Sequence, residues 1–167
     1  MEHARHPDPD LEEPWAYTLH LPHDPRSSGV ARSTLRAVLA GHGLGTYTET
    51  ATLLTSEMVA NAFLHSDGPA RLRIRCLEEK RLRVCVMDTN PDIPPPFDAP
   101  PGPGEQAGAF LEARRRCLDL GGRGLLLVRY WADNWGGYPL AESLWGMHGK
   151  LLWFELTPDG SAFAPAA

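Results

Sequence analysis

The chain has 167 residues, of which 43% are hydrophobic, and its formal net charge is −5. This length is typical of one domain with its own hydrophobic core. An acidic balance argues against a nucleic-acid binder, which normally presents a basic face. No apolar run reaches about 18 residues, and the first residues contain no apolar signal segment. We therefore expect neither membrane insertion nor export.

The three cysteines are Cys76, Cys85 and Cys117. They are odd in number and form no C-x-x-C pair, so they indicate neither a disulfide framework nor a zinc site. A reducing cytoplasm is therefore the expected location. The frequent use of Ala, Gly, Pro and Arg is typical of a GC-rich bacterial genome.

The first half of the chain predicts a strand followed by two helices. Residues 1–13 are charged and contain prolines, which predicts a disordered lead-in. Trp15–Leu21 alternates as a strand does. Ser28–Ala40 has the apolar stripe of an amphipathic helix, which includes Val30. Tyr47–His65 repeats apolar residues at helical spacing over a longer stretch.

A hairpin follows these helices. Arg71–Cys76 and Arg81–Val86 alternate strictly between apolar and polar residues, and Glu78–Lys80 turns between them. One face of this hairpin is apolar and the other is rich in arginine. The pattern is typical of an antiparallel sheet covered on one side by helices, with the arginines most simply on the solvated face.

Seven prolines fall between Pro91 and Pro103. They predict a long loop over Thr89–Gly121, and a loop of this length inside a compact domain is usually functional or disordered. A short helix within it would carry Arg114–Arg116. Such a run of arginines is most simply a solvated helix face.

The last part of the chain predicts a buried helix at Leu125–Trp131 and two closing strands at Ala132–Tyr138 and Lys150–Leu156. Residues 158–167 are expected to form a disordered tail. The order of elements predicts an α+β fold, a two-layer sandwich in which a mostly antiparallel mixed sheet is covered on one face by helices. Residues 14–157 would form this one domain.

Glu57 and Asn61 stand four residues apart in the second predicted helix. One helical turn separates them, so both side chains project from the same face. Taken alone, such a pair is more often a solvated face. It also suits a magnesium-nucleotide site, in which the amide oxygen holds the metal and the carboxylate orients or deprotonates a nucleophile.

The nine residues from Glu57 read E-M-V-A-N-A-F-L-H. They resemble the N box of the GHKL ATPase superfamily, E-L-V-x-N-A-x-x-H. The order of elements over nearly the whole folded chain is most similar to the anti-sigma-factor kinase branch, the small single-domain relatives of histidine kinases. The resemblance implies that Glu57 is the general base and that Asn61 ligates Mg²⁺. For His65, a structural and a catalytic role stay equally open.

Two further segments match this family. Asp88 corresponds to the aspartate of the G1 box, which implies a hydrogen bond from the adenine amino group. Gly122-Arg123-Gly124 resembles the G2 box, which implies contacts with the ATP phosphates; Arg123 either adds a charged contact or points to water. The loop Thr89–Gly121 would then be the ATP lid.

The sequence departs from the family pattern at two places. Asp88 is followed by Thr89-Asn90-Pro91 instead of glycines. The strand Gly149–Leu156 resembles the family's last strand, G-K-T-V-W-F-x-L, and Leu151 stands in place of the threonine that contacts the adenine region.

The resemblance implies an ATP- and Mg²⁺-dependent serine/threonine protein kinase. Such a protein binds a sigma factor and phosphorylates a serine of a small anti-anti-sigma protein. The departures leave a second hypothesis open, namely a module that binds ATP without catalysis, or has lost ATP, and only sequesters a partner. Direct contact with nucleic acid or membrane is not expected. Relatives often form homodimers, and the sequence leaves the oligomeric state open.

Three other interpretations fail. A Rossmann fingerprint after Gly122 needs a third glycine where Leu127 stands, and a Walker loop ending at Lys150 needs a glycine where Leu144 stands. A histidine autokinase needs a pair of dimerisation helices, which the sequence lacks, and His42 lies in a turn flanked by glycines.

Overall fold

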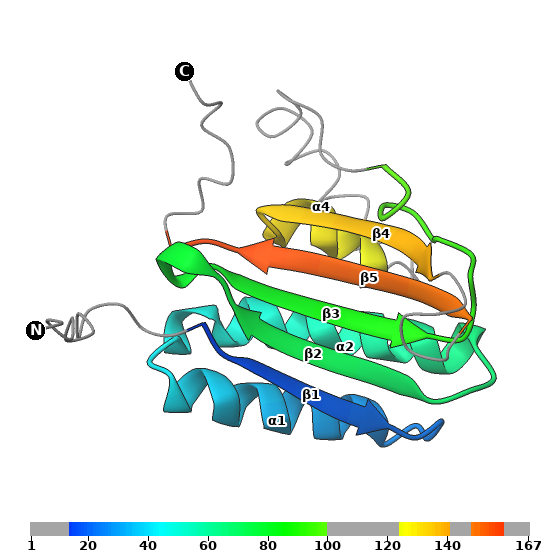
Figure 1. Ribbon diagram of the computed structural model, residues 1–167, viewed down its shortest axis with the longest axis horizontal. Helices are drawn as coiled ribbons and strands as arrows, with labels where there is room; N and C mark the ends of the chain where they lie inside the picture. Colours follow the sequence, from blue (N-terminus) through cyan, green and yellow to red (C-terminus); the bar gives the residue numbers. More distant parts are fainter. Residues whose placement is uncertain (1–13, 100–123, 141–147, 159–167) are drawn as a thin grey trace, which may run out of the picture.

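The computed structural model describes residues 14–99, 124–140 and 148–158. In chain order the helices and strands are β1 (Ala16–Leu21), α1 (Ser27–Gly41), α2 (Thr48–His65), β2 (Ala70–Cys76), β3 (Leu82–Asp88), α4 (Val128–Trp131), β4 (Asn134–Leu140) and β5 (Gly149–Leu156). Short 3-10 turns stand at Gly45–Tyr47, Glu78–Lys80 and Gly124–Leu127. Figure 1 shows these elements along the sheet. Within the described ranges, no helix combines the length and the apolar character needed to cross a membrane.

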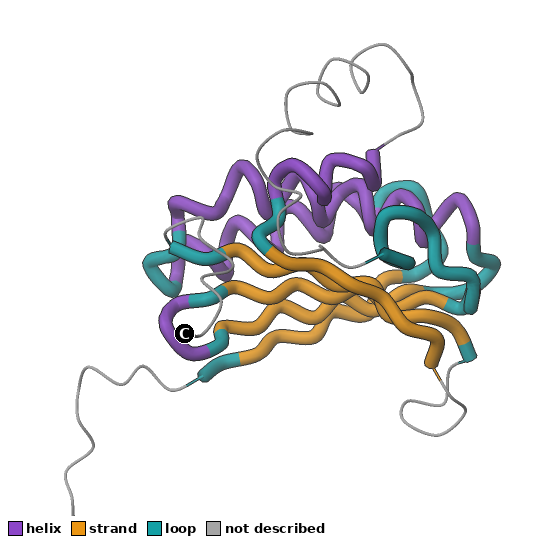
Figure 2. The backbone as a smooth tube through the Cα atoms, turned by 90° about the horizontal axis from the view of Figure 1, so that it is seen from above, coloured by secondary structure: helices purple, strands orange, loops and turns teal. Residues whose placement is uncertain are grey.

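The five strands form one sheet in the order β1-β2-β3-β5-β4. Each neighbouring pair is antiparallel, so the described strands contain no parallel pair of the kind that a mixed sheet would have. α1 packs against α2, and α2 lies over β2 and β3. The α-helices that the structure describes, α1, α2 and α4, lie on one side of the sheet, as Figure 2 shows from above. The predicted α+β sandwich with one covered face is confirmed.

The two long helices bury the faces that their apolar periodicity predicts. In α1, Ala31, Leu35 and Leu39 are fully buried at intervals of one turn. Val30, which was expected in the same stripe, is 50% exposed because it lies about 100° around the helix from Ala31. In α2 the buried apolar residues are Ala51, Leu54, Met58, Val59 and Ala62.

The segment before β4 differs from the prediction. Leu125–Trp131 does not form one continuous helix, because it begins as a 3-10 turn and only Val128–Trp131 is α-helical. The amide of Ala132 donates to Val128 O at 2.9 Å and closes this helix. Ala132 is therefore unavailable to the sheet, and β4 begins two residues later than the predicted strand.

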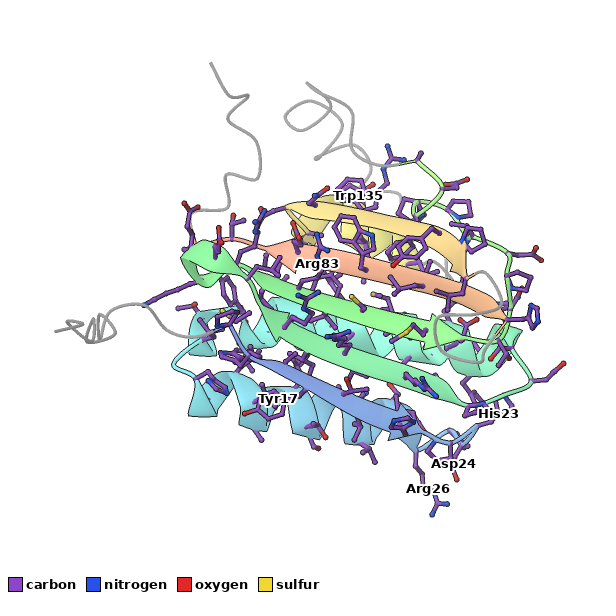
Figure 3. The ribbon with its side chains drawn as sticks, in the orientation of Figure 1. Tyr17, His23, Asp24, Arg26, Arg83 and Trp135 are labelled. Atoms are coloured by element: carbon purple, nitrogen blue, oxygen red, sulfur yellow. The ribbon has the colours of Figure 1, made fainter. Side chains whose placement is uncertain are left out.

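The sheet face that points away from the helices carries the predicted arginines (Figure 3). Along β2, Arg71, Arg73 and Arg75 alternate with the buried Leu72 and Ile74. These arginines are half-buried rather than fully solvated. Long side chains lying on a sheet cover apolar surface with their methylene groups and keep their charged ends at the edge of the patch.

Cys85 of β3 lies under this layer of side chains and is 7% exposed. Burial raises the pKa of its thiol to about 11, although the positive charges of Arg83, Arg75 and Arg73 act in the opposite direction. The desolvation of the thiolate therefore outweighs three neighbouring cations. Cys85 is a protonated, structural cysteine at neutral pH.

The raised pKa of Cys85 predicts a loss of stability in alkali. Above pH 9 the unfolded thiol loses its proton while the native thiol keeps it, so the free energy of unfolding falls as pH rises toward 11. We expect this contribution to be about 1 kcal/mol at about pH 10 and to be absent in Cys85→Ala. Urea unfolding of both proteins near neutral pH and at about pH 10 measures it. An equal fall in the free energy of unfolding of the native protein and of Cys85→Ala would show that the Cys85 thiol is not the cause.

Candidate functional site

Glu57 and Asn61 lie half-buried on α2, in the layer that covers the sheet. α2 packs against the 3-10 turn Gly124–Leu127 and against α4. Gly124 lies directly against the Glu57 carboxylate, since a Cβ at position 124 would overlap Glu57 Oε2 and Cδ. Glycine leaves room for the carboxylate where a larger residue would displace it. The structure thus brings Glu57 to the segment that was expected to contact phosphates.

Asn61 lies one turn further along α2. Its Oδ1 atom is buried and has no hydrogen-bond partner within the described part of the chain. Leaving a buried acceptor unpaired costs roughly 1–3 kcal/mol, so such an atom in a native protein usually has a water, ion or ligand to bind. An amide oxygen is a hard ligand of the kind that Mg²⁺ takes. Asn61 therefore fits the metal ligand that the resemblance implies, and Glu57, the expected base, lies one turn away on the same helix.

Asp88 ends β3 and faces the helix layer, where it is 2% exposed. Lys150 of β5 stands opposite it in the sheet register and is 1% exposed. The Lys150 ammonium donates to Asp88 Oδ1 at 3.0 Å and to the Asn90 carbonyl oxygen at 3.1 Å. A buried carboxylate and a buried ammonium thus neutralise each other. Both Lys150 and the Asn90 amide contact Oδ1, and neither of these contacts uses Oδ2.

The turn after β3 is built by side-chain hydrogen bonds instead of glycines. The Asn90 amide donates to Asp88 Oδ1 at 2.8 Å, and the Asp92 amide donates to Asn90 Oδ1 at 3.0 Å. Asp and Asn side chains that bond the amide two residues ahead replace a backbone turn. Asn90 Nδ2 also donates to His65 O at 2.8 Å, which ties this turn to the end of α2.

α2 is therefore the element at which the predicted site segments meet. Gly124 contacts it at Glu57, and Asn90 binds its last residue, His65. The exposed His65 contributes its backbone oxygen, which is a structural contact. Gly122 and Arg123 lie outside the described residues, so their predicted phosphate contacts stay predictions.

The first part of the expected ATP lid, residues 89–99, is anchored to the sheet. Phe97 is 1% exposed and lies against Gly137 of β4. The indole of Trp135 donates from Nε1 to Pro96 O at 3.2 Å. The rest of the expected lid, with Arg114–Arg116, falls outside the described residues.

The structure corrects the role of Leu151. The prediction placed Leu151 at the adenine contact in place of a threonine. Side chains alternate along a strand, so Lys150 and Leu152 face the helix layer and Leu151 faces the opposite side. There Leu151 lines a pocket on the open face of the sheet. The residue of β5 that reaches Asp88 is Lys150.

Lys150 is the residue of this site that the sequence interpretation missed. Its neighbours in β5 are apolar, and a lysine in such a strand is buried only when a carboxylate pairs with it. A lysine in an apolar strand can be recognised in the sequence. The carboxylate that pairs with it cannot be identified there, because the pairing depends on how β3 and β5 align.

The comparison with protein families agrees with this arrangement. A model described as a histidine kinase-like ATPase domain matches residues 21–137, which is more than half of the chain. The chain therefore belongs to the histidine kinase-like ATPase domain family. The match includes Glu57, Asn61 and Asp88 and ends before β5. It confirms the suspected superfamily, and the anti-sigma-factor branch stays a prediction. A search of curated proteins found no match.

The buried ion pair predicts strongly coupled effects of mutation. Lys150→Met leaves the Asp88 carboxylate buried without its counter-ion, and we expect a loss of about 3–5 kcal/mol in the free energy of unfolding. Asp88→Asn in the same chain removes the uncompensated charge, so the double variant should be more stable than Lys150→Met alone. Denaturant unfolding of the single and double variants measures this coupling.

The exposed pair Arg26–Asp24 is the control for this experiment. Its N···O distance is 2.7 Å, which is shorter than that of the buried pair, but the Arg26 side chain is 86% exposed. We expect Arg26→Met to leave the unfolding midpoint nearly unchanged. If Arg26→Met lowered the free energy of unfolding as much as Lys150→Met does, burial of the ion pair would not be the cause of the loss in stability.

The contact of Gly124 with Glu57 predicts a second coupling. Gly124→Ala places a methyl group on the carboxylate, so Glu57 must move to another rotamer, at a cost of about 1 kcal/mol in stability. The same change in a Glu57→Ala background should cost less. Gly41→Ala, where a Cβ meets nothing within 4 Å, is the control. A double-mutant cycle by chemical unfolding gives the coupling, and additive losses would refute the contact.

Proposed function

We propose that the protein binds ATP with Mg²⁺ and acts as a serine/threonine protein kinase of the anti-sigma-factor type. The observation that carries the proposal is the buried Oδ1 of Asn61, which pairs with no described residue, one turn from a Glu57 carboxylate that lies against Gly124. A metal ligand and a base on one helix face, next to a glycine turn, are the parts that phosphoryl transfer requires.

Asn61 would hold the metal through its free amide oxygen. When bound, Mg²⁺ would neutralise charge on the phosphates and help to align them. The Gly122–Gly124 segment would contact the phosphate oxygens through backbone amides, since glycines allow close approach. Family membership supports a nucleotide site in general, and the orphan oxygen supports this particular ligand.

Asp88 would accept a hydrogen bond from the adenine amino group. Lys150 and the Asn90 amide both donate to Oδ1 and thereby orient the carboxylate. Oδ2 is then the oxygen that would accept the hydrogen bond from the adenine amino group. A guanine presents a carbonyl oxygen at the corresponding position, and a carboxylate would repel it. The pair Asp88–Lys150 would therefore select adenine while remaining neutral overall.

Glu57 would act on the acceptor serine of a partner protein. Its carboxylate takes the proton of the serine hydroxyl, the serine oxygen forms a bond to the γ-phosphorus, and the bond from that phosphorus to the β-γ bridging oxygen breaks. ADP leaves, and the proton stays on the carboxylate until water removes it. Gly124 fixes where the carboxylate lies, so it has a positioning role.

The partners that we propose are a sigma factor and a small anti-anti-sigma protein that carries the acceptor serine. A cytoplasmic location agrees with the buried thiol of Cys85, which forms no disulfide. Proteins of the anti-sigma-factor branch often form homodimers, and the proposed function leaves the oligomeric state open.

The second candidate function is a module that binds a partner without phosphorylating it. The observation in its favour is that Lys150 already pairs with the carboxylate that would recognise adenine, in a turn that lacks glycines. Both candidates predict the same fold, so the distinction lies in nucleotide binding and phosphoryl transfer.

The first experiment measures ATP binding by calorimetry with and without Mg²⁺. We expect magnesium-dependent binding that is weakened about tenfold or more by Asn61→Ala, because one metal contact is lost. Asn134→Ala on the other face of the sheet is the matched control and should bind as the native protein does. Failure of the native protein to bind ATP with Mg²⁺ would overturn the site.

The second experiment follows the transfer of label from γ-³²P-ATP to candidate anti-anti-sigma proteins. Loss of a general base lowers phosphoryl transfer by roughly a hundredfold or more, and we expect this loss in Glu57→Ala. Glu49→Ala is the matched control, because Glu49 is exposed in the first turn of the same helix. ATP binding without transfer by the native protein would favour the sequestering module.

A further inference from the structure

The sheet face opposite the helices carries a compact basic patch. We call it the arginine face; it consists of Arg71, Arg73 and Arg75 of β2, Arg83 of β3, Tyr138 of β4, and Leu151 and Trp153 of β5. The register puts these residues side by side, with Arg75 opposite Arg83. A chain with a net charge of −5 thus concentrates positive charge on one face.

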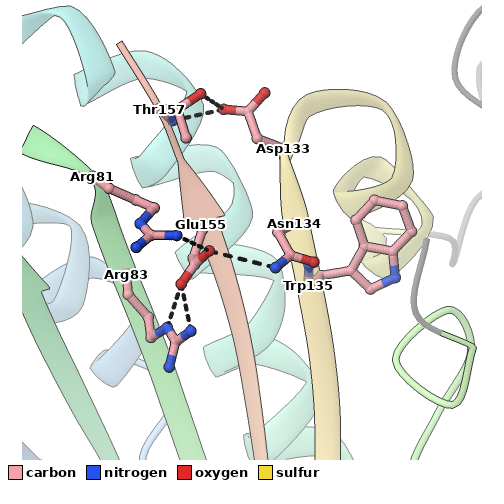
Figure 4. A network of polar contacts seen from close by, with 7 residues as sticks. All are labelled: Arg81, Arg83, Asp133, Asn134, Trp135, Glu155 and Thr157. Atoms are coloured by element: carbon pink, nitrogen blue, oxygen red, sulfur yellow. Dashed lines mark hydrogen bonds and ion pairs between the residues drawn. The ribbon is translucent and has the colours of Figure 1, made fainter. Parts of the chain in front are cut away.

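Only part of this charge is compensated. Arg83 binds Glu155, with Nε to Oε1 at 2.7 Å and Nη2 to Oε1 at 2.5 Å. Arg81 approaches the other oxygen of Glu155 at 3.8 Å (Figure 4). The single carboxylate, 2% exposed, is therefore shared by two cations.

Arg73 and Arg75 have no carboxylate partner among the described residues. The Nε atom of Arg73 is also buried without a hydrogen-bond acceptor in that part of the chain. A buried guanidinium donor without an acceptor is costly, which indicates that an acceptor is missing from this face. Arg73 and Arg75 are among the residues that line a hollow of about 150 Å³, together with Arg83, Tyr138 and Trp153.

Trp153, one of the residues that line this hollow, does not offer an open ring face for stacking nucleic-acid bases. The Arg83 guanidinium carbon lies 4.5 Å from the Trp153 ring centroid. The ring also lies against β4, since a Cβ at Gly136 would come within 2.9 Å of it. Binding of single strands depends on ring faces that are open to stacking, and the Trp153 ring lies under the Arg83 guanidinium and against β4.

We infer that the arginine face docks an acidic, extended segment of a partner protein. Arginines at alternate positions of β2 present their charges at a repeat of roughly 6.6 Å, twice the rise per strand residue. An extended peptide with a carboxylate at every second residue has the same repeat. It would pair its carboxylates with Arg73 and Arg75 through charge-assisted, bidentate hydrogen bonds and place its apolar residues on Leu151 and Tyr138.

This docking surface is independent of the proposed kinase function. It lies on the side of the sheet that α2 does not cover, so it requires no nucleotide. A second copy of the same chain is a poor occupant for face-to-face contact, because two arginine faces would repel each other.

The test uses a fluorescein-labelled peptide of alternating glutamate and leucine, with fluorescence anisotropy as the readout and no ATP present. We expect saturable binding that weakens as salt is added. The double variant Arg73→Gln, Arg75→Gln should bind about tenfold more weakly or worse, since it loses two charge-assisted contacts. The double variant Arg26→Gln, Arg36→Gln removes the same charge from exposed positions near α1 and should bind as the native protein does.

Three outcomes would overturn the inference. The first is equal binding of a peptide in which glutamine replaces glutamate. The second is an equal loss of affinity in both double variants, whose folding is checked by thermal unfolding. The third is evidence of a different occupant, which is either tighter binding of a single-stranded oligonucleotide or a change of oligomeric state in sedimentation when Arg73 and Arg75 are replaced. None of these results depends on ATP binding, so the proposed function is tested separately.

Discussion

The pairing of β3 with β5 is the constraint on which both faces of the molecule depend. One antiparallel register sets Asp88 opposite Lys150 and Arg83 opposite Glu155. Because side chains alternate along a strand, the first pair faces the helix layer and the second faces the open side. A slip of one residue would exchange the two faces. Gly149 permits this register, since a Cβ there would overlap the Asp88 carbonyl oxygen.

The two ion pairs differ in how deeply their charged groups are buried, and this difference decides how much net charge each pair leaves on its face of the sheet. Asp88 and Lys150 are both almost fully buried, so each depends on the other and together they form a neutral, oriented unit. On the open face Glu155 is buried while the Arg83 side chain is 32% exposed. Glu155 is shared by Arg81 and Arg83, so the open face keeps a net positive charge there. The neighbouring Arg73 and Arg75 add further positive charge. The helix side therefore suits a specific polar ligand, and the open side suits an acidic chain.

Much of the fold could be predicted because its signals are local. The alternation of β2 and β3 and the apolar repeat of α2 predicted elements that the structure confirms within one or two residues. Predictions failed where the exposure of a residue or the first residue of a strand depends on how an adjacent element packs. Val30 is exposed because it lies to one side of the buried stripe of α1, which includes Ala31, and β4 starts late because Ala132 completes α4. For the candidate site, the spacing of Glu57 and Asn61 was visible in the sequence, whereas the contact of Glu57 with Gly124 was not.

By itself, the sequence determined the fold class, the two faces of the sheet and the helix face that carries Glu57 and Asn61. These features follow from periodicities of two and 3.6 residues, which any reader of the chain can count. Only the tertiary structure decided that Lys150, and not Leu151, reaches Asp88, and that Asn61 Oδ1 has no partner among the residues that the structure describes. Both facts depend on how distant segments align and which atoms they cover. That alignment comes from the packing of the whole chain, and no local pattern contains it.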